Sequence, residues 1–465
     1  MGVLKQKRGK EKLGSVGFFL CLLGCLWLCA GRARPALGHD VEHPEVAEHT
    51  ALWGPLLSKV GPTFAEIHVG LADGVARSVQ LRVKEAKKGG PNHPPLLEKT
   101  SPQSLWHTLQ MDGLVPSHLY RYELVFAGLP MFVGEFSTAP TQNDARPLSF
   151  AVFGDEQASP RNDSQSSRAI ALAIVAEAPD LVIGTGDLVS KGGQVEDWRE
   201  LSKTHRYLWS QFLYLPALGN HELFGDVDGS FFRRLLPQAA TRFYAVRYGY
   251  VLLLFLDGNR PGSPEQTAFL EKELLQAAKD PSIRAKLVVL HQPPLSAGLH
   301  CGSAGSMWRW MQLFEQHHVD AVLAGHDHAY ERLERNGVPY FVSGGGGAKL
   351  YPQSPCGQPD EPALQVYESA HHYVMLEFRP SGSRVEIAVR AQVPQGMPFD
   401  RVTLPLPKSV VGLLERDDDN TPPPQHFHRG HVRYLLRHHG VQLLFLLGVG
   451  AVLAWAWRKG RSRRS

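Results

Sequence analysis

Apolar and polar side chains alternate along several short stretches in the first part of the chain. The alternation is clearest at residues 64–70, 79–83 and 119–126, and turn-forming residues such as Gly-Gly-Pro-Asn at 89–92 separate these stretches. A period of two residues places successive side chains on opposite faces of a strand, so each stretch predicts a half-buried β-strand. Short strands separated by turns are typical of an antiparallel sandwich. We therefore predict an all-β domain over residues 49–140, with no catalytic cluster in it.

From residue 146 onward the apolar stretches are continuous and run directly into polar loops. Three of them are residues 148–153, 181–184 and 287–290. Helical candidates lie between them, at residues 167–178 and 265–278. Apolar strands that alternate with helices are typical of a layered α/β domain, and we predict such a domain over residues 146–400. Polar side chains at the ends of these strands are where active sites usually lie.

The N-terminal stretch is typical of an export signal. Basic residues precede an apolar run at residues 18–30, which is too short to span a bilayer. Ala-Leu-Gly at residues 36–38 offers the small side chains that a signal peptidase recognises, so we predict a signal peptide over residues 1–38. Two alternatives are lipidation at Cys25, which ends a lipobox-like Leu-Leu-Gly-Cys sequence, and an uncleaved anchor.

The C-terminal stretch predicts a membrane anchor. Residues 441–457 are apolar apart from Gln442, and a basic tail follows at residues 458–465. An acidic run and three consecutive prolines mark residues 408–438 as a linker. Positive charge prefers the cytoplasmic side, so we expect an exported, membrane-anchored protein whose catalytic domain lies outside the cytoplasm. The alternative is a buried hydrophobic helix.

Composition changes this picture little. The 465 residues carry a formal net charge of +4, and much of the basic excess lies at the two ends. The middle of the chain therefore offers no basic surface for nucleic acid. Three of the five cysteines lie in the predicted signal, which leaves Cys301 and Cys356. An oxidising compartment would allow these two to form a disulfide, and the alternative is two separate buried thiols.

Five polar clusters follow apolar strands of the second domain. They are Gly-Asp-Glu-Gln at 154–157, Gly-Asp-Leu-Val-Ser at 186–190, Gly-Asn-His-Glu at 219–222, His-Gln-Pro at 291–293 and Gly-His-Asp-His at 325–328. Each supplies a carboxylate, amide or imidazole, and these donors suit hard or borderline divalent metals. A Gly-Asp pair alone is uninformative because chance supplies it often. Gly-Asn-His-Glu and Gly-His-Asp-His together, each after an apolar strand, are a strong signal.

These motifs resemble those of the calcineurin-like metallophosphoesterases, and more closely those of the purple acid phosphatases. The resemblance covers about residues 49–400, and the first domain is similar to the fibronectin-type-III-like domain of that family, which ends here in Phe-Ser-Thr-Ala-Pro at 136–140. The resemblance implies an α/β fold, a four-layer sandwich of two β-sheets flanked by helices, behind an all-β sandwich.

The same resemblance implies a binuclear-metal-dependent hydrolase of phosphate esters. It would act as an acid-phosphatase-like phosphomonoesterase on small molecules, with a metal-bridging hydroxide as the nucleophile. Two alternatives are a phosphodiesterase or nucleotide hydrolase on the same centre, and a non-catalytic surface-binding protein that inherited the fold. The intact set of metal-binding residues argues against the last of these.

By position, the resemblance assigns six residues to two divalent metal ions, and a seventh candidate departs from the family's pattern. Asp155 and His328 would bind the first metal, Asp187 would bridge both, and Asn220, His291 and His326 would bind the second. Two cations some 3.5–4 Å apart need an anionic bridge, which a carboxylate can supply. The seventh residue, Gln157, is a departure from the family, and its side-chain carbonyl could bind the first metal. The alternative is a glutamine that only hydrogen-bonds within its loop.

A second departure concerns the identity of the metals. Ser190 stands where purple acid phosphatases carry a tyrosinate that stabilises ferric iron and gives the purple colour. Without that phenolate, both the ferric ion and the colour are in doubt. Neutral oxygen and imidazole donors favour divalent iron, manganese or zinc.

Three residues are candidates for the chemistry itself. His221 resembles the catalytic histidine of the family, which binds the phosphoryl group or protonates the leaving oxygen. Glu222, beside it, could orient or charge that imidazole. His300 lies nine residues after His291, close to where the family places further substrate-facing histidines, and a disulfide at Cys301 could hold it in position. The alternative is an exposed loop histidine.

Overall fold

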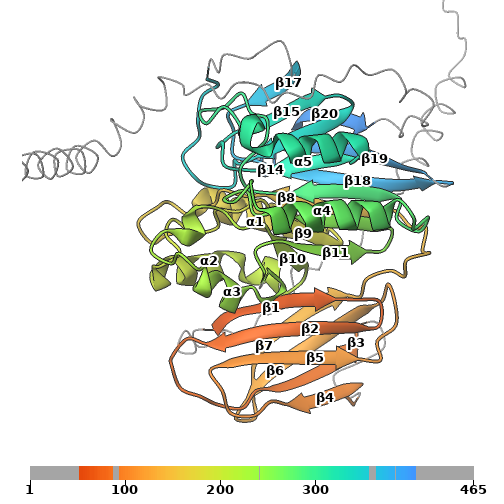
Figure 1. Cartoon of the computed structure of the whole chain (residues 1–465). Helices are drawn as coiled ribbons and strands as arrows, with labels where there is room; N and C mark the ends of the chain where they lie inside the picture. Colours follow the sequence, from red (N-terminus) through yellow and green to blue (C-terminus); the bar gives the residue numbers. More distant parts are fainter. Residues whose placement is uncertain (1–51, 87–93, 240, 355–362, 383, 405–465) are drawn as a thin grey trace, which may run out of the picture. The chain divides into compact units, whose positions relative to one another are not determined.

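A computed structural model of the chain describes residues 52–86, 94–239, 241–354, 363–382 and 384–404 (Figure 1). The predicted signal peptide, linker, membrane helix and basic tail all lie outside these residues. Within the described residues, every helix is too short or too polar to cross a bilayer.

The first domain consists of antiparallel strands only. One sheet has the order β1-β2-β5 and the other has the order β4-β3-β6-β7. The strands are β1 (Leu52–Val60), β2 (Phe64–Leu71), β3 (Gln80–Glu85), β4 (Leu97–Thr100), β5 (Trp106–Asp112), β6 (Leu119–Phe126) and β7 (Leu129–Ser137). Burial alternates along β5 as the period of two requires, and the inward side chains of both sheets join one apolar core. The prediction of an N-terminal all-β domain is confirmed.

The second domain begins with a six-stranded sheet of order β10-β9-β8-β18-β19-β20. Its strands are β8 (Leu148–Phe153), β9 (Leu181–Gly184), β10 (Leu213–Pro216), β18 (Tyr373–Ser381), β19 (Arg384–Gln392) and β20 (Pro398–Leu404). β8, β9 and β10 are parallel, so their carboxyl ends lie at one edge of the sheet. An apolar cluster joins this sheet to α1 (Gln165–Glu177), α2 (Val195–Trp209) and α3 (Ser230–Leu235).

A seven-stranded sheet of order β11-β12-β13-β14-β16-β15-β17 follows. Its strands are β11 (Tyr244–Tyr248), β12 (Val251–Phe255), β13 (Ala285–Val289), β14 (Ala321–Ala324), β15 (Tyr330–Arg335), β16 (Val338–Ser343) and β17 (Ala363–Glu368). β12, β13, β14 and β16 are parallel. A separate apolar cluster joins this sheet to α4 (Pro264–Ala277) and α5 (Ala304–Gln316).

The largest apolar cluster contains side chains from both sheets of the second domain, for example Phe150 of β8 and Leu253 of β12. The mixed α/β architecture expected from the sequence is therefore confirmed. The two helices predicted at residues 167–178 and 265–278 correspond to α1 and α4, which begin two residues and one residue earlier. In α4 the start is fixed by Ser263, whose side chain accepts a hydrogen bond from the backbone N–H of Gln266.

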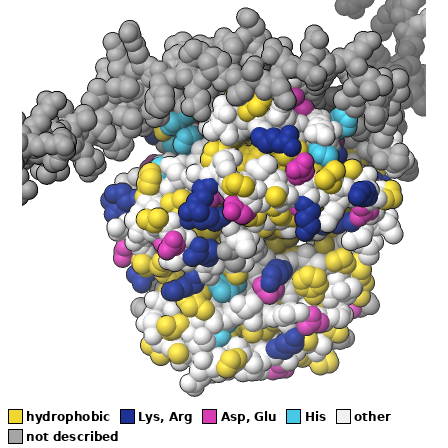
Figure 2. All heavy atoms as spheres, in the orientation of Figure 1, with side chains coloured by type: hydrophobic (Ala, Val, Ile, Leu, Met, Phe, Trp, Pro, Cys, Tyr) yellow, Lys and Arg dark blue, Asp and Glu magenta, His cyan; other side chains and the backbone are white. Residues whose placement is uncertain are grey.

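Charges of both signs are spread over the described surface. On the face in Figure 2, Lys and Arg side chains alternate with Asp and Glu side chains, and no continuous basic area covers that face.

Candidate metal centre

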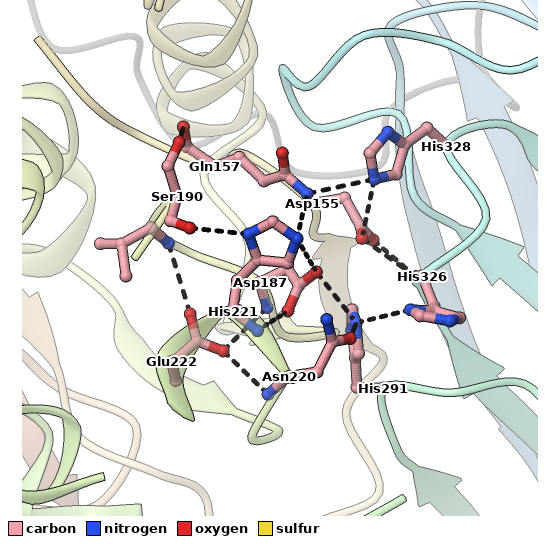
Figure 3. Close-up of polar contacts among 12 residues, drawn as sticks. Asp155, Gln157, Asp187, Ser190, Asn220, His221, Glu222, His291, His326 and His328 are labelled. Atoms are coloured by element: carbon pink, nitrogen blue, oxygen red, sulfur yellow. Dashed lines mark hydrogen bonds and ion pairs between the residues drawn. The ribbon is translucent and has the colours of Figure 1, made fainter. Parts of the chain in front are cut away.

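All five polar clusters meet at the carboxyl ends of the parallel strands. Residues 154–157 follow β8, 186–190 follow β9 and 219–222 follow β10, whereas 291–293 follow β13 and 325–328 follow β14. The clusters therefore come from both sheets, and Figure 3 shows their side chains pointing toward one another. The structure brings together all seven candidate ligands and His221.

One group of donors surrounds Asp187. The ligand atoms of Asp187, His291 and His326 all lie within 4.8 Å of one another. Asp187 Oδ2 is 3.2 Å from His291 Nε2, and the same nitrogen is 3.2 Å from both His326 Nδ1 and Asn220 Oδ1. A carboxylate, an amide oxygen and two imidazoles that converge in this way fit a divalent cation.

A second group lies around Asp155. Its Oδ1 is 3.6 Å from His328 Nε2, and its carboxylate accepts the backbone N–H of His326. The amide nitrogen of Gln157 lies 3.3 Å from His328 Nε2 and 3.2 Å from His221 Nε2, so Gln157 stands between the two imidazoles (Figure 3). A half-turn of that amide would place its carbonyl oxygen at the same point.

Backbone carbonyls orient three of these imidazoles. His291 Nδ1 donates to the carbonyl of Thr185 at 2.9 Å, and His328 Nδ1 donates to that of Lys349 at 2.8 Å. His221 Nδ1 donates to the carbonyl of Ser190 at 2.8 Å. A histidine that gives one N–H to a carbonyl presents the lone pair of its other nitrogen, which is how metal-binding histidines are usually held. The donor set therefore fits a metal centre in orientation as well as in chemistry.

The two buried carboxylates respond differently to their surroundings. Burial raises the pKa of Asp155 well above its ordinary value, and the negative charge of Asp187 adds to the shift against the opposing charge of His291. Burial acts on Asp187 too, but His291 and His221 outweigh it and hold its pKa well below the ordinary range. Two like charges this close resist full ionisation unless cations are bound beside them.

The imidazoles also divide into two kinds. Burial lowers the pKa of His328 to about 4, and burial together with His300 and His291 lowers the pKa of His326 well below 6.5. Burial opposes a charge on His291, but Asp187 and Asp155 raise its pKa to about 10. The lowered pKa values of His326 and His328 favour the neutral ring that ligation requires. A metal would compete with protons at His291 and at Asp155, whose pKa values are raised.

Four candidate ligands have left-handed backbone conformations. The φ angles are 61° at Asp155, 44° at Gln157, 54° at Asp187 and 72° at His326. This conformation is uncommon for residues other than glycine, and it is concentrated at functional sites where the surrounding fold maintains it. It turns each side chain back across the end of its strand, toward the centre.

Two glycines leave the space that the carboxylates occupy. A Cβ atom at Gly219 would collide with Asp187 Oδ1 and lie 2.7 Å from Glu222 Oε2. A Cβ at Gly325 would collide with Asp155 Oδ2 and lie 2.8 Å from Thr185 Oγ1. No larger residue fits at either position without moving a candidate ligand.

Glu222 differs from its expectation. Its carboxylate does not contact the His221 imidazole but accepts backbone N–H groups of Asp187, Leu188 and Gly219 at 2.8–3.0 Å (Figure 3). Burial and the charge of Asp187 raise its pKa to about 8. The side chain thus holds the loop that carries Asp187, while the carbonyl of Ser190 accepts the Nδ1–H of His221. A catalytic role for Glu222 stays a prediction.

His300 lies beside the centre. Its ring centroid is 4.1 Å from that of His326, and Asp327 Oδ1 accepts both its backbone N–H and its Nδ1–H. Sequence reasoning gave Asp327 no role, although it is part of the Gly-His-Asp-His motif. Cys301 is disulfide-bonded, and its expected partner Cys356 lies outside the described residues.

Ser190 does not face the metal-binding residues with its hydroxyl. Its Oγ donates to the backbone carbonyl of Gln157 at 2.7 Å and accepts a hydrogen bond from Asn162 Nδ2 at 2.8 Å. The position that a tyrosinate occupies in purple acid phosphatases is therefore used here to tie two loops together.

Comparison with known proteins agrees with this geometry. Residues 148–330 match the family model of the calcineurin-like phosphoesterases. This part of the chain is a calcineurin-like metallophosphoesterase domain, and such a domain implies a hydrolase of phosphoric esters.

More distant similarity points to the purple acid phosphatases. Purple acid phosphatase 7 of Arabidopsis thaliana is 27% identical over 269 residues, which are 51% of this chain and 81% of that protein. An uncharacterised protein of Mycobacterium tuberculosis is 26% identical over 318 residues, covering 53% of this chain. The match spans only 60% of the length of that relative.

Solved structures share the fold. A purple acid phosphatase from yellow lupin (Lupinus luteus) seeds superimposes with a TM-score of 0.61 at 17% identity, over 76% of this chain and 74% of that one. PhoD superimposes with a TM-score of 0.55 at 12% identity, over 78% and 94%. At these identities the likeness concerns the arrangement of sheets and helices only.

Proposed function

We propose that this chain hydrolyses phosphate monoesters of small molecules at a centre of two divalent metal ions. The observation that supports this most is the position of Asp187, which lies 3.2 Å from His291 Nε2 and 3.7 Å from His221 Nε2. One carboxylate thus borders both the imidazole-rich group and the candidate acid–base histidine. The charge of Asp187 also acts on Asp155 and His328, so Asp187 lies near both groups of donors, as a bridging ligand would.

In this proposal each metal is held by residues from both sheets. Asp155, Gln157 and His328 bind the first ion, Asn220, His291 and His326 bind the second, and Asp187 binds both. Divalent iron, manganese and zinc suit these donors. When bound, such ions activate water as a nucleophile and neutralise charge on the phosphoryl oxygens.

His221 handles the proton of the leaving group. Since its Nδ1–H is donated to the carbonyl of Ser190, the other nitrogen, Nε2, faces the centre. A proton held at Nε2 can pass to the departing oxygen.

His300 binds the phosphoryl group in the same scheme. Its Nδ1–H is donated to Asp327 at 2.8 Å, which directs its Nε2 away from that carboxylate, and the ring lies against His326. A histidine fixed in this way contributes a positioned hydrogen bond at little entropic cost.

The finer architecture belongs to the proposal as well. The apolar cluster shared by the two sheets, and the helix clusters that each sheet has in addition, support a four-layer sandwich over residues 146–400. The two antiparallel sheets of the first domain support a fibronectin-type-III-like sandwich over residues 49–140.

The same proposal places the enzyme outside the cytoplasm, tethered through residues 441–457 after removal of residues 1–38. Its support is the charge and hydropathy of the two ends of the sequence. Protease treatment of intact cells that express the full chain should degrade the catalytic domain. Protection of that domain would contradict the orientation.

One pair of measurements tests the activity. Purified protein should contain two transition-metal ions per chain by mass spectrometry and should hydrolyse p-nitrophenyl phosphate faster than bis-p-nitrophenyl phosphate. A preference for the diester would make the enzyme a phosphodiesterase or nucleotide hydrolase. Absence of both metal and turnover would leave a surface-binding protein with an inherited fold.

A further inference from the structure

A short 3₁₀ turn places an aromatic ring directly beside the proposed acid–base histidine. The turn covers His221–Leu223 and is followed by Phe224, whose backbone N–H donates to the carbonyl of His221 at 3.2 Å. In a 3₁₀ turn, side chains three residues apart lie one above the other. The ring centroids of His221 and Phe224 are accordingly 4.6 Å apart, while Leu223 packs against the apolar cluster around α2.

Packing against His221 uses only part of the Phe224 ring. The residue is 47% exposed, so part of its apolar surface is accessible to a ligand. The main chain of Phe224 is tied to a neighbouring loop, since its carbonyl accepts the N–H of Gly193 at 2.9 Å. An accessible aromatic ring beside the leaving-group histidine is suited to contact the leaving group.

The rest of the loop is mixed in character. Val227 is 77% exposed. The carboxylate of Asp226 is used inside the loop, where it accepts the Ser230 hydroxyl and the Phe231 N–H. Arg242 borders the loop and donates to the carbonyl of Val227 at 2.9 Å.

A second aromatic residue beside the metal centre is arranged differently. Tyr351 stacks flat on His328, with centroids 4.1 Å apart and planes at 13°, and also lies 5.7 Å from His300. Tyr351 therefore adjoins a candidate ligand and a candidate substrate-binding ring, whereas Phe224 adjoins the ring of the proposed acid–base histidine.

We propose that Phe224 forms a subsite for aromatic leaving groups, so that aryl phosphate monoesters are preferred over polyol phosphates. The inference rests on the proposed function, because it uses His221 as the residue beside the leaving oxygen. Stacking of an aryl ring on an accessible aromatic face is worth roughly 3–10-fold in binding, with additional gain from the apolar area removed from water.

Phosphonates test the subsite without chemistry, because their P–C bond is not hydrolysed. Binding of phenylphosphonate and of methylphosphonate to the metal-loaded protein is measured by calorimetry. We expect phenylphosphonate to bind at least about tenfold more tightly. Phe224→Ala should reduce that ratio to about twofold or less, and Phe224→Trp should retain it. Leu172→Ala, a change at a side chain of similar exposure (48%) on α1, should leave the ratio unchanged.

Turnover supplies the second readout. With Phe224→Ala, kcat/KM for phenyl phosphate should fall by roughly tenfold, while kcat/KM for glycerol 2-phosphate should stay within about threefold of the wild-type value. Equal losses for both esters would show that Phe224 only supports His221, and would overturn the subsite, as would equal binding of the two phosphonates by the wild type. If neither phosphonate binds and no ester is hydrolysed, the proposed function fails together with the subsite.

Discussion

The two sheets of the second domain contribute different chemistry to one centre. Loops after β8, β9 and β10 of the six-stranded sheet carry the oxygen donors Asp155, Gln157, Asp187 and Asn220. The candidate ligands in the loops after β13 and β14 of the seven-stranded sheet are all imidazoles. Both sets stand at the carboxyl ends of parallel strands, so the same structural solution serves two kinds of ligand.

This division places the candidate carboxylate ligands on one side and the candidate imidazole ligands on the other, where burial is outweighed by Asp187 and Asp155, which raise the pKa of His291 to about 10. The oxygen side concentrates two carboxylates, and the charge of Asp187 contributes to the raised pKa of Asp155. The imidazole side contains His326 and His328, whose pKa values are lowered chiefly by burial, so that both rings are neutral. A cation between the sheets neutralises one side and uses the lone pairs of the other. Under the proposed assignment, neither sheet can build the centre alone.

The largest effect is expected from the oxygen side. Asp187→Ala removes the proposed bridge between the cations and also the acceptor of the His221 backbone N–H. Metal content and hydrolysis should be lost together, with kcat/KM lower by at least about 10⁴-fold. Mass spectrometry and p-nitrophenyl phosphate turnover measure both. Glu196→Ala, at an exposed carboxylate in the first turn of α2, is the control and should change neither. An Asp187 variant that is active with two metals would refute the bridge.

His221 tests whether a residue from the oxygen side can be catalytic without binding metal. His221→Ala should leave both ions bound while kcat falls by roughly 10²–10⁴-fold, the usual contribution of a general acid. Metal stoichiometry and kcat are measured on the same preparation. Loss of an ion in this variant would make His221 a ligand and would add an imidazole to the oxygen side.

A matched pair of variants sharpens the comparison between the sheets. Gln157→Ala should weaken the first metal site by about 10–100-fold and leave the second largely occupied, whereas His326→Ala should do the reverse. Metal titrations of the two variants give the affinities.

The wild type should be colourless in a visible spectrum, because Ser190 cannot form a phenolate-to-ferric band. A purple wild type, or unchanged affinity in Gln157→Ala, would mean that Gln157 is only a loop residue.

The smallest effect concerns a buried imidazole that is not a proposed ligand. His372 immediately precedes β18 of the six-stranded sheet. Its ring forms hydrogen bonds with Ser343 Oγ and with the carbonyl of Ala370. Burial lowers its pKa from 6.5 to about 4, so the unfolded chain binds this proton more tightly. The stabilisation is complete above pH 6.5 and is lost as the pH falls toward 4.

Urea unfolding at pH 7 and pH 4.5 measures that loss. His372 should account for about 2–3 kcal/mol of the difference in unfolding free energy between the two pH values. In His372→Phe the difference should shrink by this amount, even if stability at pH 7 is also reduced. An unchanged difference would show that His372 does not titrate in this range.

The sequence predicted the strand ends better than the helices. Apolar strands that run into polar motifs identified where every candidate ligand lies, because strand burial and loop polarity are local properties of the sequence. α2 and α5 were not predicted. In α2 the mean hydropathy is low, although Trp198, Leu201 and Trp209 are fully buried against the sheet. These side chains recur at helical spacing, so the sequence contained the amphipathic pattern of α2, which was overlooked beside the more prominent apolar strands.

The roles of individual side chains could be predicted only in part. Convergence of the candidate ligands followed from motif order, but Glu222 was assigned to His221 because the two are adjacent in sequence. A turn of 3₁₀ helix separates their side chains and sends the carboxylate to backbone N–H groups. Asp327 was overlooked for a related reason, since its partner His300 lies 27 residues away.

The glycines at positions 219 and 325 bear on how inherited variants of this protein should be judged. Neither residue has a functional group, yet a single added methyl at either position would collide with Asp187 or Asp155. A Gly219→Ala or Gly325→Ala allele would keep every proposed ligand and would score as a mild exchange of small residues. We expect it to behave as a null allele for metal binding. A survey that screens only the reactive side chains would classify such an allele as benign.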